Sequence, residues 1–371
     1  YCKKRTWNHI MSSLLSGVTV LDLTINVPGP FCSMNLSDLG ARVIKIEPPG
    51  GDPLRSEKEM WDNLNRGKES IVLNLKSTKD KLYLSKLAKI ANIVIEGWRP
   101  GVAKRLSADY ETLKKENNQL IYCSISGFGQ EGEWNKRPGH DINYLALSGY
   151  LDMQAKVEGK PWAPTVLLSD LSSGFYATIA ILAALNKQNI TKTGTYIDLS
   201  MTESAISLLN IEIGRIKSEN HMPNVTNIPH YGVFECSDNK WYSLGIVHEN
   251  HFWDRFCKTA GLEKFIGINF DERLNQYELI NKTLKKTFLL NPSYEWDKRL
   301  KELDIPGAIV ISLEETLNTK ELTNRKFFKN INNSSFMKMP FKFSSYDIGP
   351  FNSPPNLGQN TNEILDQIKL F

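Results

Sequence analysis

Apolar residues follow two alternating patterns along the first half of the chain, and each pattern predicts a different element. Short runs rich in Val, Ile and Leu are typical of buried strands, and they cover residues 18–24, 42–47, 70–75, 92–98 and 120–129. Between them lie segments with helical spacing, over residues 28–41, 78–91 and 107–118. Ser107 is the expected N-cap of the last helix. Alternation on this scale predicts an α/β fold with a Rossmann-like parallel sheet.

In the second half of the chain, the pattern of predicted helices and strands changes. Residues 170–186 read as a long apolar helix, and residues 195–201 as one more strand. After about residue 225, the segment 231–246 reads as two strands joined by an Asp-Asn turn, which predicts an antiparallel hairpin. Helical segments rich in Lys, Leu and Glu follow to about residue 320, so we expect a smaller α+β domain there. The tail ends in an amphipathic helix.

Composition narrows the class of protein. The 45 basic and 41 acidic residues give a net charge of +4 without blocks of like charge, which argues against nucleic-acid binding. The apolar run 175–185 is too short to span a bilayer, and the start of the chain has no secretory pattern. We therefore expect an intracellular, cytoplasmic protein, with mitochondria or peroxisomes as alternatives and Met11 as the candidate natural start. Five scattered cysteines indicate reduced thiols: Cys2, Cys32, Cys123, Cys236 and Cys257.

Common catalytic motifs do not occur in the sequence. The chain has no phosphate-binding GxxxxGK[ST] motif, no GxGxxG after the first strand, no HExxH and no GxSxG. His248 and His251 are three residues apart but have no surrounding carboxylate motif, so we expect no metal site. Gly29, Gly127 and Gly174 are interpreted as turn or close-packing positions.

Three positions carry candidate chemistry. His140 and Asp141 follow a Pro-Gly turn after a strand end, where doubly wound sheets place their sites; this pair could also be an ordinary surface turn. Asp170 precedes the long apolar helix and Glu249 precedes another amphipathic segment, so helix capping is the alternative role for both. A His and a carboxylate that converge on one carbon atom would form a two-base proton-transfer site.

Several ordered motifs resemble those of the class III CoA-transferases, the CaiB/BaiF type, and are nearest to the α-methylacyl-CoA racemase branch. They are "PGPFCSMNLSDLGARVIKIEPPGGDPLR", "NRGKESIVLNLKS", "ANIVIEGWRPGVAKRL", "RPGHDINYLALSG" and "LLSDLSSGFYATIAILAAL". The resemblance implies an acyl-CoA substrate, no separate cofactor, and an interlocked homodimer. It also implies a large Rossmann-like domain built from 11–200 and a returning segment 316–371, a linker helix at 201–225, and a small domain at 226–315.

The resemblance also implies site residues. In the racemases a "GHD" histidine stands thirty residues before the catalytic Asp, and His140 and Asp170 have that spacing. Asp141 or Glu249 would set the tautomer of His140, and the backbone N–H after His140, in the "GHD" turn, would hold the enolate oxygen. Gly139 is a further candidate for contact with the ligand. Arg99, Arg66 and Lys45 are candidates for the CoA phosphates, with surface ion pairs as the alternative. The glycine run that oxalate-type transferases carry does not occur here.

Three functions follow from this resemblance. The first is a racemase in which His140 and Asp170 exchange the α-proton of an acyl-CoA. The second is a CoA-transferase in which Asp170 is the nucleophile that forms an acyl anhydride and then an enzyme-CoA thioester. The third is an acyl-CoA binding protein without catalysis.

Overall fold

The computed structural model describes residues 13–218 and 227–369. Cys2, Met11 and part of the predicted linker at 201–225 lie outside these ranges. The chain forms two compact units. The first comprises Tyr1–Ile211 and Thr323–Phe371, and the second comprises Glu212–Leu322. The domain boundaries expected from the sequence stay a prediction.

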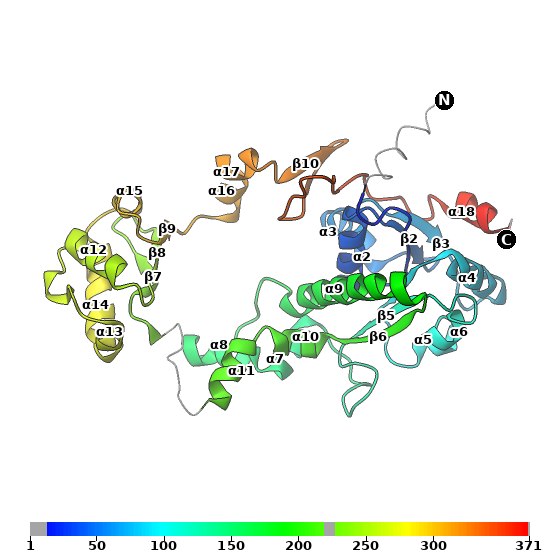
Figure 1. Cartoon of the computed structure of the whole chain (residues 1–371), viewed down its shortest axis with the longest axis horizontal. Helices are drawn as coiled ribbons and strands as arrows, with labels where there is room; N and C mark the ends of the chain where they lie inside the picture. The colour runs from blue at the N-terminus through cyan, green and yellow to red at the C-terminus, as the bar shows by residue number, and fades with distance from the viewer. Residues whose placement is uncertain (1–12, 219–226, 370–371) are drawn as a thin grey trace. The chain divides into compact units, whose positions relative to one another are not determined.

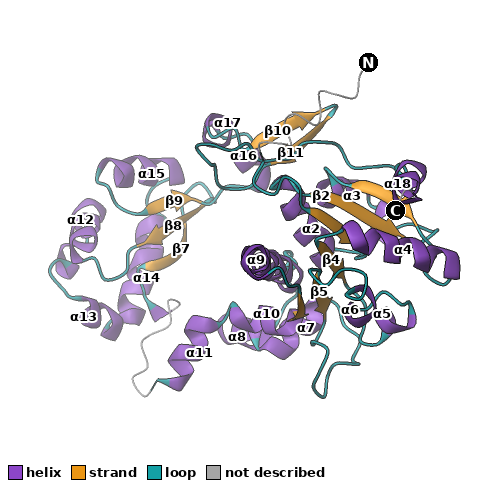
Figure 2. Ribbon diagram, turned by 45° about the vertical axis from the view of Figure 1, so that its right-hand side comes forward, coloured by secondary structure: helices purple, strands orange, loops and turns teal. Residues whose placement is uncertain are grey.

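A six-stranded parallel sheet forms the centre of the first unit (Figures 1 and 2). Its strand order is β3-β2-β1-β4-β5-β6, so the order of the strands reverses between β1 and β4. The predicted α/β class and parallel sheet are confirmed. The strands are β1 (Thr19–Asp22), β2 (Arg42–Glu47), β3 (Glu69–Val72), β4 (Ile93–Glu96), β5 (Ile121–Ser126) and β6 (Thr195–Ser200).

Successive residues of a strand point to opposite faces of the sheet, and both faces are covered. Leu21, Ile44 and Val94 belong to a core with helices α4, α6 and α18. Their neighbours Val20 and Ile93 belong to a second core with α2 and α9. Burial on both faces explains why apolar residues occupy successive positions in these strands.

Two helices of the first unit begin at residues other than those predicted from the sequence. Ser107 has a φ of 57° and is not a cap; Asp109 instead accepts from the Thr112 N–H and begins a helix of one turn. The long apolar helix begins at Leu168, so Asp170 lies inside its first turn and is not the N-cap. The helices are α2 (Pro28–Asp38), α3 (Lys58–Asn65), α4 (Thr78–Ile90), α5 (Val102–Arg105), α6 (Tyr110–Leu113), α7 (Asp141–Ser148), α8 (Tyr150–Glu158), α9 (Leu168–Thr191), α10 (Met201–Ser207) and α18 (Thr361–Lys369).

The second unit contains a three-stranded antiparallel sheet covered by helices. The predicted hairpin is present as β7 and β8, which pair in register from Tyr231 opposite Gly245 to Glu235 opposite Trp241. Its core is aromatic and centres on Trp253, Phe288 and Trp296. The elements of this region are α11 (Asn210–Lys217), β7 (Tyr231–Glu235), β8 (Trp241–Gly245), α12 (Asn250–Ala260), α13 (Phe270–Asn275), α14 (Tyr277–Phe288), α15 (Ser293–Glu302), β9 (Gly307–Ile309), α16 (Leu313–Leu317) and α17 (Lys320–Asn324). The chain then returns to the first unit through the hairpin of β10 (Phe328–Ile331) and β11 (Ser334–Met337).

Helix α9 packs closely against α2 (Figure 1). In the part of the chain that the structure describes, α9 is the one helix long and apolar enough to cross a membrane by length and composition. A core helix meets the same criteria, and Ala177, Ile181 and Leu185 of α9 are part of the core. Gly174 lies at the closest approach, where an added Cβ would be 2.8 Å from the Pro28 carbonyl oxygen.

Substituting Gly174 by Ala is expected to lower the free energy of unfolding by about 1–3 kcal/mol, because the new methyl group would force α2 and α9 apart. Urea unfolding measures the change. Gly214→Ala is the matched control: Gly214 lies in α11, and no atom lies within 4 Å of the added Cβ. That variant is expected to be neutral or slightly more stable. Equal stability of Gly174→Ala and the parent protein would contradict the prediction.

Candidate active site

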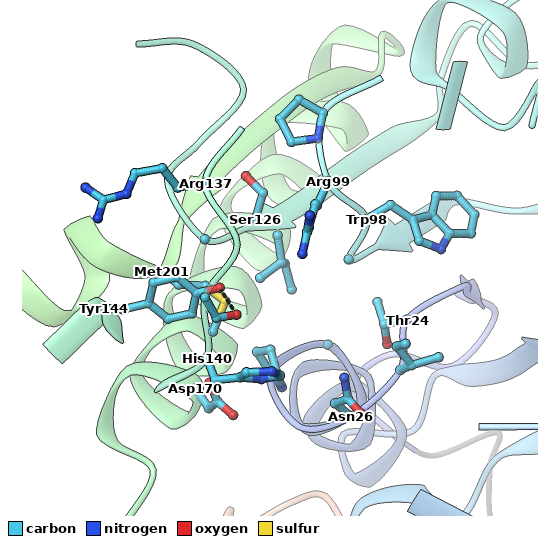
Figure 3. A pocket seen from close by; sticks show the side chains of 18 of the residues that line it. Thr24, Asn26, Trp98, Arg99, Ser126, Arg137, His140, Tyr144, Asp170 and Met201 are labelled. Carbon is cyan, nitrogen blue, oxygen red and sulfur yellow. Dashed lines mark hydrogen bonds between the residues drawn. The ribbon is translucent and has the colours of Figure 1, made fainter. Parts of the chain in front are cut away.

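A cleft of about 340 Å³ lies at the carboxyl edge of the parallel sheet (Figure 3). Its walls come from the segments that follow β1, β4 and β5, together with the start of α9. Doubly wound sheets bind ligands where the strand order reverses, which here is between β1 and β4. The lining residues belong to the first unit: Thr24, Ile25, Asn26, Pro28, Gly29, Gly97, Trp98, Arg99, Pro100, Ile125, Ser126, Gly127, Asn135, Arg137, Gly139, His140, Tyr144, Asp170 and Met201.

His140 and Asp170 both line this cleft, as the spacing in the sequence led us to expect. Figure 3 shows their side chains at the same end of it. His140 immediately precedes α7, and Asn143 Oδ1 accepts its backbone N–H at 3.0 Å. Asp170 is the third residue of α9. Two helix starts therefore bring an imidazole and a carboxyl group to one cavity.

The Asp141 carboxylate contacts the start of α9. Its Oδ1 accepts the backbone N–H groups of Ser169 at 2.7 Å and Asp170 at 3.1 Å. The side chain is 8% exposed. Asp141 thus caps α9 from outside that helix and joins the starts of α7 and α9. The expected influence of Asp141 on the tautomer of His140 stays a prediction.

Burial and the nearby Asp141 carboxylate raise the pKa of Asp170 to about 7. Burial also raises the pKa of Asp141, although its two backbone donors oppose that shift. A carboxyl group with a pKa near neutrality can act both as an acid and as a base at physiological pH. Because the folded state holds this proton more tightly than the unfolded chain, the contribution of Asp170 to stability falls as the pH rises from about 4 through 7.

Substituting Asp141 by Asn is expected to lower the pKa of Asp170. The amide oxygen can still accept the two α9 N–H groups, but the negative charge beside Asp170 is removed. Carbon-13 NMR of labelled Asp residues follows the titration. Asp152→Asn is the matched control, because Asp152 lies on α8 and pairs with Lys156. An unchanged midpoint for Asp170 in Asp141→Asn would contradict the contribution of the Asp141 charge and leave burial as the sole cause of the shift.

Tyr144 packs against the loop that precedes His140. Its hydroxyl donates to the Gly139 carbonyl at 2.7 Å. A Cβ at Gly139 or at Gly127 would approach the Tyr144 ring to 2.7 or 2.6 Å, so both positions need glycine. Gly139, which we predicted to contact the ligand, lines the cleft. It also packs directly against the Tyr144 ring.

The predicted phosphate-binding cations have different environments. Arg99 is exposed and lines the cleft. Lys45 is buried and donates to the Thr24 carbonyl, and it pairs with Asp52 at 2.9 Å.

Arg66 is also buried and pairs with Asp38 at 2.6 Å. A cation that is desolvated and already paired cannot turn toward a ligand without leaving a buried carboxylate alone. The placement of Lys45 and Arg66 therefore argues against their predicted phosphate contacts.

Glu249 belongs to the second unit, where it stands directly before α12. Its side chain makes no capping bond to that helix; Oε2 accepts the Val247 N–H at 2.9 Å, which holds the pKa of Glu249 below its usual value. The His248 ring packs edge-on against Phe270, 5.4 Å away. Within residues 13–218 and 227–369, no group of three or more His, Cys, Asp or Glu side chains is arranged to hold a metal ion.

The cleft also includes polar and aromatic residues that the motifs did not single out. Arg137 lies in the same loop as His140, and its guanidinium is 5.8 Å from the centre of the Trp134 ring. Trp98 precedes Arg99 on the turn after β4, and Asn26 lies just before α2. The closeness of Arg137 and Trp98 to His140 and Arg99 in the sequence is a signal that could have identified them.

This fold and site place the protein in a known class. The model of CoA-transferase family III matches residues 15–361, and the chain belongs to that family. Two solved structures share the fold: a CaiB/BaiF family protein from Brucella suis, with a TM-score of 0.85 at 24% identity over 96% of this chain and 100% of that one, and Rv3272 from Mycobacterium tuberculosis, with a TM-score of 0.86 at 24% identity over 95% and 99%.

Relatives of both reaction types are similar to the chain to the same degree. Human alpha-methylacyl-CoA racemase is 34% identical over 74% of this chain and 70% of its own length. Mouse succinyl-CoA:glutarate CoA-transferase is 34% identical over 68% of the chain, which spans 61% of that protein. Acetyl-CoA:oxalate CoA-transferase of Acetobacter aceti is 32% identical over 75% of both chains. The protein is an enzyme of family III, and sequence identity does not choose between racemase and transferase.

Proposed function

We propose that the protein is an acyl-CoA racemase that moves the α-proton of a 2-methyl-branched or related acyl-CoA thioester. The observation that carries this proposal is the presence of His140 and Asp170 on one cleft at the carboxyl edge of the sheet. A thioester carbonyl acidifies the neighbouring C–H bond, because the resulting carbanion is an enolate. Two bases on opposite faces of that carbon can remove the proton and return it on the other side.

The surroundings of the two bases support this chemistry. With a pKa raised to about 7, the Asp170 carboxyl can give or accept a proton near neutrality. The Asp141 N–H is the first of α7, and the first N–H groups of a helix have no intrahelical acceptor. Such a donor would stabilise an enolate oxygen, typically by about 3–4 kcal/mol.

The cleft has a neighbour that suits the nucleotide end of coenzyme A. An apolar pocket of about 210 Å³ shares Ile25 and Trp98 with the cleft. A flat aromatic base would fill such a pocket, and Lys76 on its wall and Arg99 in the cleft could meet phosphate groups. The remaining lining residues are Leu23, Ile46, Glu47, Pro48, Leu73, Asn74, Leu75 and Leu106.

A CoA-transferase is the second candidate, favoured by the equal identity to the mouse transferase. Its carboxylate nucleophile would be Asp170. The Asp170 oxygen would attack the thioester carbonyl and release CoA thiolate, leaving an acyl anhydride. The thiolate would then attack the Asp170 carbonyl and expel the acyl group as a carboxylate, and an acceptor acid would take the CoA by the reverse steps.

Incubation of a chiral 2-methylacyl-CoA in deuterated water separates these reactions. Inversion at C2 with uptake of deuterium would support the racemase. Transfer of CoA to an added acid, with an enzyme ester that hydroxylamine traps, would support the transferase and overturn the racemase if no exchange accompanies it. Tight binding without turnover across a panel of acyl-CoA thioesters would support the third possibility, a binding protein.

We also propose a homodimer, because α9 presents apolar side chains that the first unit leaves uncovered. Phe175 is 53% exposed, Ile179 60% and Ile190 74%. Light scattering after size exclusion would give twice the chain mass of 42.2 kDa. A monomer at micromolar concentration would contradict this proposal.

A further inference from the structure

Three polar side chains lie level with one another near the carboxyl ends of neighbouring strands. Glu96 of β4 is the register partner of Ser124 of β5, and Ser124 is the partner of Asp198 of β6. Two of these strands lead into segments that line the cleft: Gly97 to Pro100 follow β4, and Gly127 follows β5. This polar row therefore lies directly behind two walls of the cleft.

Hydrogen bonds connect the row to both walls. Glu96 Oε2 accepts the Trp98 N–H at 2.7 Å, and Oε1 accepts the Ser124 hydroxyl. Ser124 Oγ in turn accepts from Gln130 Nε2 at 2.8 Å. The Gln130 N–H donates to Asp198 at 3.0 Å. One carboxyl group thus holds the backbone of the turn after β4 and, through Ser124, the loop after β5.

Burial of the Glu96 carboxyl group is energetically unfavourable. It is 3% exposed, and the donors that reach it are neutral. Burial raises its pKa to about 7, with a smaller contribution from the Asp198 carboxylate; the hydroxyls of Tyr122 and Tyr196 are close enough to interact with it electrostatically. Burying a carboxyl group without a cation normally destabilises a protein, so its location behind the cleft points to a role in function.

We propose that Glu96 is a positioning residue that orients the turn from Gly97 to Arg99 for recognition of the nucleotide part of the substrate. Its bond to the Trp98 N–H fixes the backbone that carries the two cleft side chains, Trp98 and Arg99. Figure 3 shows both on the turn after β4, across the cleft from His140 and Asp170. This inference rests on the proposed function, in which the cleft takes a CoA thioester.

The test compares two Glu96 variants. Glu96→Gln keeps an oxygen for the Trp98 N–H and can donate to Ser124, so its Kd for CoA thioester is expected to stay within about threefold of the parent value. Glu96→Leu has no acceptor, and its Kd is expected to rise about tenfold, as for loss of a hydrogen bond to a charged group. The Kd of the corresponding pantetheine thioester, which lacks the nucleotide, is expected to change less than twofold.

Two further variants separate positioning from general damage. Leu84→Ala removes packing in α4, in the core on one sheet face, and is expected to lower stability without changing either Kd. In Arg99→Met, adding Glu96→Leu is expected to weaken CoA-thioester binding less than it does in the parent protein, because part of the effect of Glu96 acts through Arg99. Should Glu96→Leu fail to fold, Glu96→Asp shortens the carboxylate reach and carries the same expectation.

The outcomes distinguish the two proposals. Calorimetry that detects no binding of CoA thioester to the parent protein would overturn the proposed function. Binding to the parent protein with an unchanged Kd in folded Glu96→Leu or Glu96→Asp would overturn the positioning role alone. Equal weakening for the pantetheine thioester would also overturn it, because the nucleotide would then not be the group recognised.

Discussion

Asp170→Ala is expected to reduce both α-proton exchange and CoA transfer by about 10³-fold, since a positioned acid–base group or nucleophile typically contributes that much. Asp170 is the one side chain that both candidate reactions require. In the first it carries the proton on one face of the α-carbon, and in the second it forms the anhydride. Exchange of deuterium at C2 and transfer of labelled CoA measure the two activities on the same preparation.

Asp152→Ala serves as the control, because this carboxylate lies on the solvent side of α8 and does not line the cleft. It is expected to leave both activities within about twofold, as for most surface substitutions. Retention of either activity within tenfold in Asp170→Ala would show that another residue performs that reaction.

His140→Ala is expected to lower α-proton exchange by about 10²–10⁴-fold and to spare most CoA transfer. Only the proton-transfer route needs a second base. The imidazole is exposed to the cleft, and the backbone of His140 is held by Asn143, so the free energy of unfolding is expected to change by less than about 0.5 kcal/mol.

The comparison variant is His251→Ala, whose ring lies in the second unit against Phe252. It is expected to retain exchange. Loss of CoA transfer together with exchange in His140→Ala would contradict the proposed division of roles. It would indicate that the imidazole serves a step that the two reactions share.

The strands could be predicted because burial on both sheet faces leaves short runs of consecutive apolar residues, such as residues 93–95 of β4. Their order could not be, since pairing is a long-range property. The Ser107 cap failed because the next possible cap, Asp109, lies two residues on and matches the actual start of the helix. The local sequence contains two residues that commonly cap helices. The backbone conformation determines which of them is the N-cap: Ser107 has a φ of 57°, and Asp109 caps the helix.

The site was predictable where chemistry and spacing coincide, at His140 and Asp170. It was not predictable where a side chain already pairs with a partner that is distant in the sequence. Lys45 and Arg66 look like free cations until Asp52 and Asp38 are seen beside them. Asp141 is the neighbour of His140 in the chain, yet its carboxylate accepts a hydrogen bond from the Ser169 N–H of α9, 28 positions later.

The link through Asp141 has a consequence for substrate choice. His140 is its covalent neighbour, and the Asp170 amide is one of the two groups that its carboxylate grips. The spacing of the two helix starts that carry His140 and Asp170 is therefore set by this one link inside the protein, not by a bound ligand. Under the proposed function, selection among acyl groups would then depend on the other residues of the cleft, which can vary without moving this pair.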